Sequence, residues 1–269
     1  MAAESYHIPF HSSSIHYTRM GNGDEWLFCF HGYGESSKAF DLLENVLFKR
    51  FTIIAIDLPF HGKTKWEEGL LFEPADLVTI INLIKPKNAS MCILGYSMGG
   101  RIALQLLEMI PEQISKLVLV APDGLHKNRW RLLATRTKIG KRLFAFCMRK
   151  PFLMIASIEL ADKIGLYNKS FLKFVHHYLD DAEQRAILFR RWTTLRNFKT
   201  DLTATKKIII NRKIPVHLVF GKYDRVILSR HGLRFSKGSN GLISVTVVEA
   251  GHQLLREKHL PVIVRGLVE

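Results

Sequence analysis

Six short runs of β-branched, aromatic and other apolar residues recur along the chain. None of them alternates polar with apolar positions, which is typical of parallel strands covered by helices on both faces. The runs are residues 26–30, 52–57, 91–94, 116–121, 216–220 and 243–248. Helix-like stretches separate most of them, at residues 38–48, 74–84, 98–110, 228–236 and 254–268. This alternation predicts an α/β fold in which helices flank a mostly parallel sheet.

Two shorter extended segments precede the first buried run. Residues 6–9 and 14–18 flank a turn at residues 11–13. This pattern predicts an antiparallel hairpin, and we place it at the edge of the sheet.

The alternation of strands and helices breaks between residue 122 and about residue 207. This stretch has a helical pattern and no convincing strand. Residues 124–200 contain 17 Lys and Arg against 5 Asp and Glu, a net charge of +12 out of +15 for the whole chain. We therefore predict a core domain made of residues 1–122 and 208–269, with a helical cap inserted at residues 123–207.

Composition narrows the class of protein. The 269 residues are 47% hydrophobic and 23% charged, which excludes a disordered or low-complexity chain. No apolar run approaches the roughly 20 residues of a membrane helix, and residues 1–10 lack the basic and apolar regions of a secretory signal. We therefore expect a soluble cytoplasmic protein. The cysteines at positions 29, 92 and 147 have no metal-ligand spacing, so we expect no metal site.

The net charge bears on the partners of the protein. A net charge of +15 suits an anionic substrate or peripheral contact with an anionic membrane, and it also suits an ordinary solvated basic face. We expect no nucleic-acid partner, because the chain shows no recognised nucleic-acid-binding motif. The oligomeric state stays open.

A Gly-x-Ser-x-Gly motif is the clearest chemical signal. The string GYSMGG at residues 95–100 follows an apolar run and precedes a helical pattern, which is the strand, tight turn and helix context that the motif requires. The turn would hold the hydroxyl of Ser97 above the sheet edge, at a helix N-terminus that favours developing negative charge. We predict Ser97 to be a nucleophile. The alternative is a glycine-rich turn with an incidental serine.

A serine nucleophile needs a base and a carboxylate that orients the base. Asp224 follows one late strand, and His252 follows the next. Because the carboxyl ends of parallel strands line one edge of a sheet, we expect Ser97, Asp224 and His252 to converge there. The loop after the first buried strand should reach the same edge, so the backbone amides of Tyr33 and Met98 are our candidates for an oxyanion hole.

These pieces together resemble the α/β-hydrolase superfamily, and the resemblance covers almost the whole chain. The matching strings, in the expected order, are FHGYGES at 30–36, IDLPFHG at 56–62, GYSMGG at 95–100, FGKYD at 220–224 and AGH at 250–252. The resemblance implies an α/β-hydrolase fold with an inserted cap and without a cofactor. It implies that Ser97 is the nucleophile, His252 the general base and acid, and Asp224 the residue that orients His252. Serine at position 97 excludes the haloalkane dehalogenases and epoxide hydrolases, which use an aspartate nucleophile.

Several residues near this site are candidates for substrate contacts. They are His31, Gly32, Tyr96, Arg101, Arg129 and Trp130. His61 and Asp57 also recur in the loops of the family, but they need no catalytic role.

Three functions are compatible with these residues. The first is hydrolysis of a carboxylic ester, or of a related acyl or carbon–carbon bond, through an acyl-enzyme on Ser97. The second is a cofactor-free lyase, because the string GYSMGGR resembles the menaquinone-pathway 2-succinyl-6-hydroxy-2,4-cyclohexadiene-1-carboxylate synthase, in which arginines hold substrate carboxylates. Arg101, Arg129 and Arg131 would then bind an anionic substrate. The third, a non-catalytic ligand-binding protein, would be marked by a broken triad. We favour the first function, that of a carboxylesterase.

Overall fold

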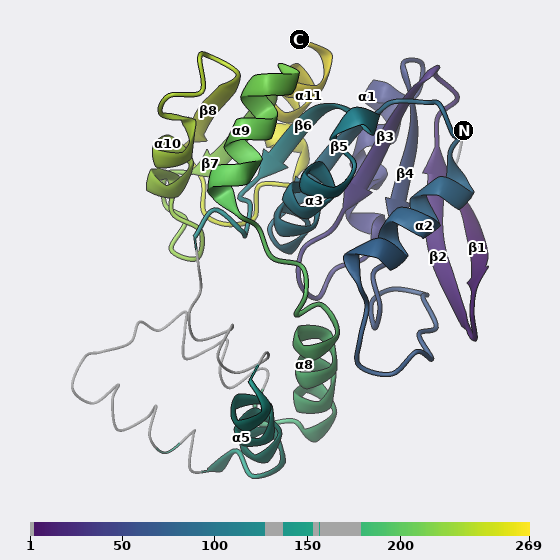
Figure 1. The fold of residues 1–269 in the computed structure, drawn as a ribbon, viewed down its shortest axis with the longest axis vertical. Coiled ribbons are helices and arrows are strands. Elements are labelled where there is room, and N and C mark those ends of the chain that lie inside the picture. Colours follow the sequence, from purple (N-terminus) through teal and green to yellow (C-terminus); the bar gives the residue numbers. More distant parts are fainter. Residues whose placement is uncertain (1–2, 127–136, 153–155, 157–178) are drawn as a thin grey trace. The chain divides into compact units, whose positions relative to one another are not determined.

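The computed structural model describes residues 3–126, 137–152, 156 and 179–269, and the chain forms two compact units (Figure 1). The first unit comprises Met1–Glu68, Phe72–Lys127 and Phe198–Glu269. The second comprises Gly69–Leu71 and Asn128–Asn197.

An eight-stranded sheet is the centre of the first unit, with the strand order β1-β2-β4-β3-β5-β6-β7-β8. The strands are β1 (Glu4–Phe10), β2 (Ser13–Met20), β3 (Glu25–Phe30), β4 (Phe51–Ile56), β5 (Met91–Tyr96), β6 (Ile114–Val120), β7 (Val216–Gly221) and β8 (Ile243–Val248). Strands β3 to β8 pair with one another in parallel. The sheet confirms the predicted α/β class.

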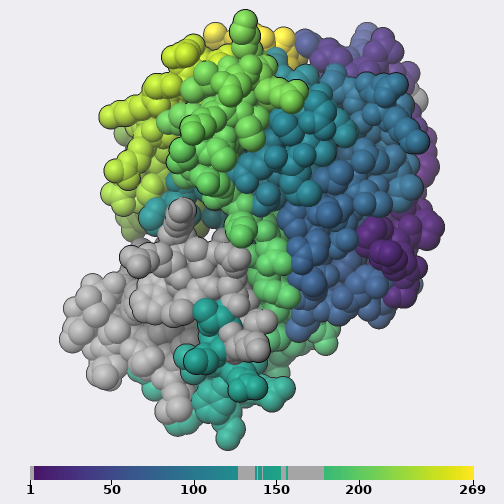
Figure 2. All heavy atoms as spheres, viewed as in Figure 1, coloured from purple at the N-terminus to yellow at the C-terminus, as the bar shows by residue number. Residues whose placement is uncertain are grey.

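The predicted hairpin forms one edge of this sheet. Strands β1 and β2 pair in antiparallel register, and β2 pairs antiparallel with β4. Most residues of β1 are exposed, because an edge strand has only one neighbour in the sheet. Figure 2 shows the start of the chain, in the darkest purple, at the surface of this unit.

Helices cover both faces of the sheet. On one face lie α2 (Pro74–Ile84), α3 (Met98–Met109) and α9 (Leu202–Arg212), as Figure 1 shows. Next to β7 and β8 lies α10 (Ser229–Ser236). The short segment η2 (Pro111–Gln113) leads into β6, and η3 (Glu257–His259) leads into α11 (Leu260–Val268). Because both faces are covered, every residue of β4 and β5 is buried, which explains the absence of alternation in the sequence.

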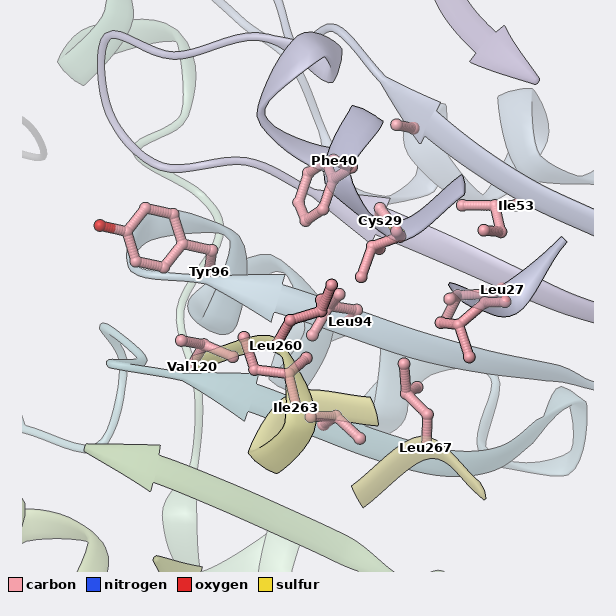
Figure 3. Close-up of a cluster of buried hydrophobic side chains, with 14 of the residues drawn as sticks. Leu27, Cys29, Phe40, Ile53, Leu94, Tyr96, Val120, Leu260, Ile263 and Leu267 are labelled. Carbon is pink, nitrogen blue, oxygen red and sulfur yellow. The ribbon is translucent and has the colours of Figure 1, made fainter. Parts of the chain in front are cut away.

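A hydrophobic core lies on the opposite face of the sheet. It brings together segments from the first and the last part of the chain. Side chains of η1 (Ser37–Leu43), α1 (Glu44–Leu47) and α11 pack there against the central strands. Figure 3 shows Phe40 and Ile263 in this cluster with Leu27 and Leu94 of β3 and β5. Each such side chain stabilises the fold by roughly 1.5–3 kcal/mol when fully buried. This core holds the strands whose ends carry the candidate site.

The predicted boundary between core and insertion, at residue 207, falls inside α9 (Leu202–Arg212). We expected the insertion to end at residue 207, but the chain returns to the first unit at Phe198. The Phe198 side chain is fully buried, and its ring stacks on Phe72 with centroids 5.7 Å apart. The backbone amide of Asp201 donates to Glu108 of α3 at 2.8 Å. These contacts join residues about a hundred positions apart, so no local sequence pattern predicts them.

The second unit contains two described helices, α5 (Lys138–Arg149) and α8 (Ala182–Thr194). The ring of Phe144 lies 5.3 Å from that of Phe189 and 5.8 Å from that of Trp192, measured between centroids. The predicted role of this unit as a cap stays a prediction, and Arg129, Trp130 and Arg131 lie outside the described residues. Over the part of the chain that the structure describes, no helix has the length and apolar character needed to cross a membrane.

Candidate active site

Ser97 occupies a strained turn between β5 and α3. Its backbone has φ 49° and ψ −111°, a conformation that non-glycine residues rarely adopt and that costs of order 1–3 kcal/mol. The Ser97 amide donates to Val120 O at 2.9 Å, and Ser97 O accepts from the amide of Asp123 at 2.8 Å. Both the backbone amide and the backbone carbonyl of Ser97 are therefore hydrogen-bonded to the end of β6 or to the loop that follows it.

Two glycines allow this turn to form. A Cβ atom on Gly99 would lie 1.8 Å from Phe30 O, and one on Gly95 would lie 2.6 Å from Gly99 O. Both distances are far below van der Waals contact, so any side chain at these positions would displace backbone. The motif glycines thus let α3 start directly beside the end of β3.

The structure brings the three predicted catalytic residues together. Ser97 Oγ lies 3.0 Å from His252 Nε2, and His252 Nδ1 lies 2.7 Å from Asp224 Oδ2. Because the carboxylate can only accept, His252 Nδ1 carries the proton and Nε2 accepts the hydroxyl proton of Ser97. This is the arrangement of a nucleophile, its base and the group that orients the base.

Asp224 is held by the turn that follows β7. Its Oδ1 accepts from the amides of Val226 at 2.7 Å and Ile227 at 2.9 Å. Burial alone would raise the pKa of this carboxyl group, but hydrogen bonds from His252 and from these two amides outweigh burial and lower the pKa. Asp224 is therefore ionised where His252 needs a negative partner.

Tyr96 supports the loop that carries His252. Its side chain is only 3% exposed, and its hydroxyl donates to the backbone carbonyl of His252 at 3.2 Å. Burial strongly raises the pKa of this phenol, so the hydroxyl keeps its proton for the hydrogen bond. The predicted contact of Tyr96 with the substrate stays a prediction.

The predicted oxyanion loop is a tight turn. The amide of Glu35 donates to Gly32 O at 3.3 Å, and Gly34 has φ +78°, as the third position of a type II turn requires. Tyr33 stands between them. Met98 is the first residue of α3, so its amide has no acceptor within the helix. The assignment of these two amides to an oxyanion hole stays a prediction.

His31 and Gly32 are also framework residues. The fully buried ring of His31 places Nδ1 2.8 Å from Gly32 O, and Nε2 accepts from the amide of Leu58 at 3.2 Å. Gly32 is buried, and a Cβ there would lie 3.1 Å from the Tyr96 ring. Both ring nitrogens of His31 thus contact backbone, and the predicted substrate contacts of His31 and Gly32 stay predictions.

Arg101 is paired inside the protein. Its Nη1 lies 2.9 Å from Asp123 Oδ2, and the side chains are 6% and 28% exposed. The other oxygen of Asp123 accepts from the amide of Gly124 at 2.7 Å. The charge of Arg101 is thus neutralised where the chain leaves β6. In this structure Arg101 therefore faces Asp123, and its predicted contact with a substrate carboxylate stays a prediction.

Replacing Arg101 with alanine should therefore act on stability. We expect a loss of about 3 kcal/mol in the free energy of unfolding, because Asp123 would keep a partly buried charge without its partner. Urea unfolding measures this loss. The control Arg265→Ala removes an exposed ion pair with Glu269 and should cost less than about 1 kcal/mol. A rise in KM confined to anionic esters would instead restore a carboxylate-binding role for Arg101.

Sequence reasoning missed two carboxylates at this edge. One is Asp123, the partner of Arg101. The other is Glu35, whose Oε2 accepts from the Gly32 amide at 3.3 Å. Burial raises the pKa of Glu35, while the Gly32 amide and His252 act in the opposite direction. The string FHGYGES contained Glu35, but only the fold brings it near His252.

The described residues offer no site for a metal ion. Within the ranges that the structure describes, no group of three or more His, Cys, Asp or Glu side chains could hold one.

His61, expected to be a loop residue, places Nδ1 2.9 Å from Pro59 O.

Comparison with known proteins places this geometry in a family. A family profile described as α/β hydrolase fold matches residues 25–139. The uncharacterized hydrolase YugF of Bacillus subtilis is 25% identical over 259 residues, which are 91% of this chain and 90% of that protein. The pimeloyl-(acyl-carrier protein) methyl ester esterase of Nitrosomonas europaea is 34% identical over 120 residues, which are 44% of this chain and 46% of that enzyme.

Solved structures share the fold over the full chain. The thioesterase domain from the curacin biosynthetic pathway has a TM-score of 0.66 at 17% identity and covers 100% of both chains. The 2-hydroxy-6-oxo-6-phenylhexa-2,4-dienoate hydrolase of Rhodococcus sp. strain RHA1 has a TM-score of 0.66 at 18% identity and covers 99% of both chains. The profile match around Ser97 and the similarity of the solved structures over the rest show that this chain has the α/β-hydrolase fold.

Proposed function

We propose that the protein is a serine hydrolase that cleaves a carboxylic ester through an acyl-enzyme. The observation that carries this proposal is the hydrogen-bonded line from Ser97 through His252 to Asp224, with lengths of 3.0 and 2.7 Å. The strained turn at Ser97 supports it, because such strain is maintained where it serves a function. A loop serine without a catalytic task needs neither feature.

The reaction begins when Ser97 Oγ attacks the ester carbonyl and its proton passes to His252 Nε2. Asp224 stabilises the imidazolium that forms. The amides of Tyr33 and Met98 donate to the oxyanion of the tetrahedral intermediate. His252 then protonates the departing alkoxide, which leaves an acyl group on Ser97. Water, deprotonated by His252, releases the acid and regenerates the serine.

The choice of an ester rests on two further points. The partial match to a methyl ester esterase, 34% identical over 120 residues, favours acyl transfer from oxygen to water. The ion pair between Arg101 and Asp123 removes the observation that favoured a lyase acting on a polycarboxylate. We propose a small-molecule ester as the substrate class, with the helical insertion as the cap that selects its acyl group.

A series of p-nitrophenyl esters from acetate to palmitate tests the proposal. We expect turnover that depends on Ser97, with a chain-length optimum that measures the acyl pocket. The matched control is Ser115→Ala, an exposed serine at the start of β6 that should leave the rate unchanged. Absence of Ser97-dependent turnover on every ester would overturn ester hydrolysis, and anionic cyclohexadiene carboxylates would then be assayed for lyase activity.

A further inference from the structure

A second histidine–aspartate pair joins strand β2 of the N-terminal hairpin to the residue that follows β4. His16 of β2 is 2% exposed, and its Nδ1 lies 2.7 Å from Oδ2 of the buried Asp57. Asp57 also accepts from the amides of Ser37 at 2.6 Å and Lys63 at 2.8 Å. Two backbone N–H groups thus donate to the carboxylate that His16 Nδ1 contacts. In the tautomer that donates from Nδ1 to this carboxylate, Nε2 of His16 is an acceptor.

The hydroxyl group of Ser5 is the hydrogen-bond partner of His16 Nε2. Ser5 Oγ lies 2.9 Å from His16 Nε2. The strand register explains the contact, since His7 stands opposite His16 and Ser5 stands opposite Thr18, so that Ser5 and His16 are diagonal neighbours on one face. Burial lowers the pKa of His16, against the opposing effect of Asp57. The neutral imidazole of His16 can therefore accept the hydroxyl proton of Ser5.

The distances reproduce those of the site at Ser97. Serine to histidine measures 2.9 Å here and 3.0 Å there, and histidine to aspartate measures 2.7 Å in both. We call Ser5, His16 and Asp57 the hairpin triad. It lies at the outer edge of the sheet, where Figure 1 shows β1, and Ser5 is exposed to solvent. An acyl donor can therefore reach Ser5 from solvent.

Two further groups next to Ser5 can stabilise negative charge. Lys63 Nζ lies 3.4 Å from Ser5 Oγ and donates to it, so its ammonium favours the developing alkoxide. Thr18, opposite Ser5, has a buried hydroxyl that finds no hydrogen-bond partner among the described residues. An unsatisfied buried hydroxyl is costly, and this one lies directly across the strand pair from Ser5.

We propose that the hairpin triad is a second acyl-transfer site, specific for activated acyl donors such as aryl esters. Ser5 Oγ attacks the ester carbonyl, His16 Nε2 takes the hydroxyl proton, and the phenolate leaves with the electron pair of its bond to the acyl carbon. The proton on His16 then passes to solvent, and water deprotonated by His16 later releases the acid from Ser5. Ser5 lies on an extended strand without a helix N-terminus, so good leaving groups are required. The proposal stands independently of the function assigned to Ser97.

Acetylation by p-nitrophenyl acetate, followed by intact mass and peptide mapping, tests this site. The full-length Ser97→Ala variant is used so that Ser97 cannot react. We expect an acetyl group on Ser5, formed at least about 100-fold faster than on other exposed serines, the lower end of general-base catalysis. The variant Ser97→Ala/Ser5→Ala should lose this adduct. The matched control Ser97→Ala/Ser12→Ala should keep it, since Ser12 is also exposed on the hairpin but donates to Glu68.

The exposed Lys63 gives a second variant that tests the mechanism without removing the nucleophile. In Ser97→Ala/Lys63→Met the acetylation of Ser5 should slow several-fold, because the cation next to Ser5 Oγ is lost. Equal acetylation of Ser5 and Ser12 would overturn the proposal. Acetyl groups found only on lysines or on the N-terminal amine would overturn it as well.

Discussion

Replacing Ser97 with alanine should lower kcat/KM for the preferred p-nitrophenyl ester by on the order of 10⁶, the loss expected when a serine nucleophile is removed. The stability of the fold should change little. Alanine keeps a Cβ at φ 49°, so the backbone strain stays the same, and the Ser97 backbone contacts with β6 do not involve the hydroxyl. Steady-state kinetics measure the loss, and thermal unfolding verifies the fold.

The background rate of this variant needs its own control. Ser5 can release p-nitrophenolate slowly, so the double variant Ser97→Ala/Ser5→Ala gives the true floor. Retention of more than about a tenth of the wild-type rate in the double variant would refute the acyl-enzyme on Ser97, because removal of a nucleophile costs far more than that. Loss of the Ser97 activity with an unchanged Ser5 adduct would show that the two sites act separately.

Asp224→Asn should lower kcat by on the order of 10⁴, by analogy with other serine–histidine–aspartate enzymes. The Val226 and Ile227 amides both donate to Oδ1, so the asparagine oxygen must stay there to accept. Its NH₂ group then faces His252 Nδ1, and two donors cannot meet. The ring changes to the tautomer that is protonated at Nε2, which cannot accept the proton of Ser97.

The same substitution should change how stability depends on pH. Because the folded-state pKa of Asp224 is lowered, its ionised form stabilises the protein above the unfolded value of about 3.9. That contribution is lost as the pH falls through the folded pKa. The difference in unfolding free energy between the wild type and Asp224→Asn should thus shrink below about pH 4, as urea unfolding at several pH values can measure. Glu249→Gln, which changes an exposed carboxylate nearby, is the kinetic control and should keep kcat.

Local patterns were sufficient to predict the sheet and the order of the catalytic residues. The buried strands were predictable because coverage on both faces favours apolar residues at consecutive positions; Thr52 is the one clearly polar residue of β4, and it is buried. Ser97 follows β5 directly, and Asp224 and His252 lie in the loops that follow β7 and β8. In a parallel sheet, this position alone decides which edge a residue reaches. Their convergence was therefore predictable without any knowledge of side-chain contacts.

Roles that depend on a distant partner were not predictable. Arg101 looked like a substrate contact until the fold placed Asp123, 22 residues later, within 2.9 Å. His31 looked available until Leu58, 27 residues away, donated to its ring. A charged or polar side chain has the same sequence signature whether it faces a substrate or a buried partner. Burial and pairing decide between these two roles.

The sequence by itself determined the α/β class, the strand-to-helix turn at Ser97 and the chain order of its partners, because these follow from periodicity and from residues adjacent to strand ends. Only the tertiary structure decided the partners of Arg101 and His31, the return of the chain to the core at Phe198, and the meeting of Ser5, His16 and Asp57. The physical reason is that hydrogen bonds and ion pairs reach only a few ångströms. Their partners are set by how strands pair and helices pack, which no local pattern encodes.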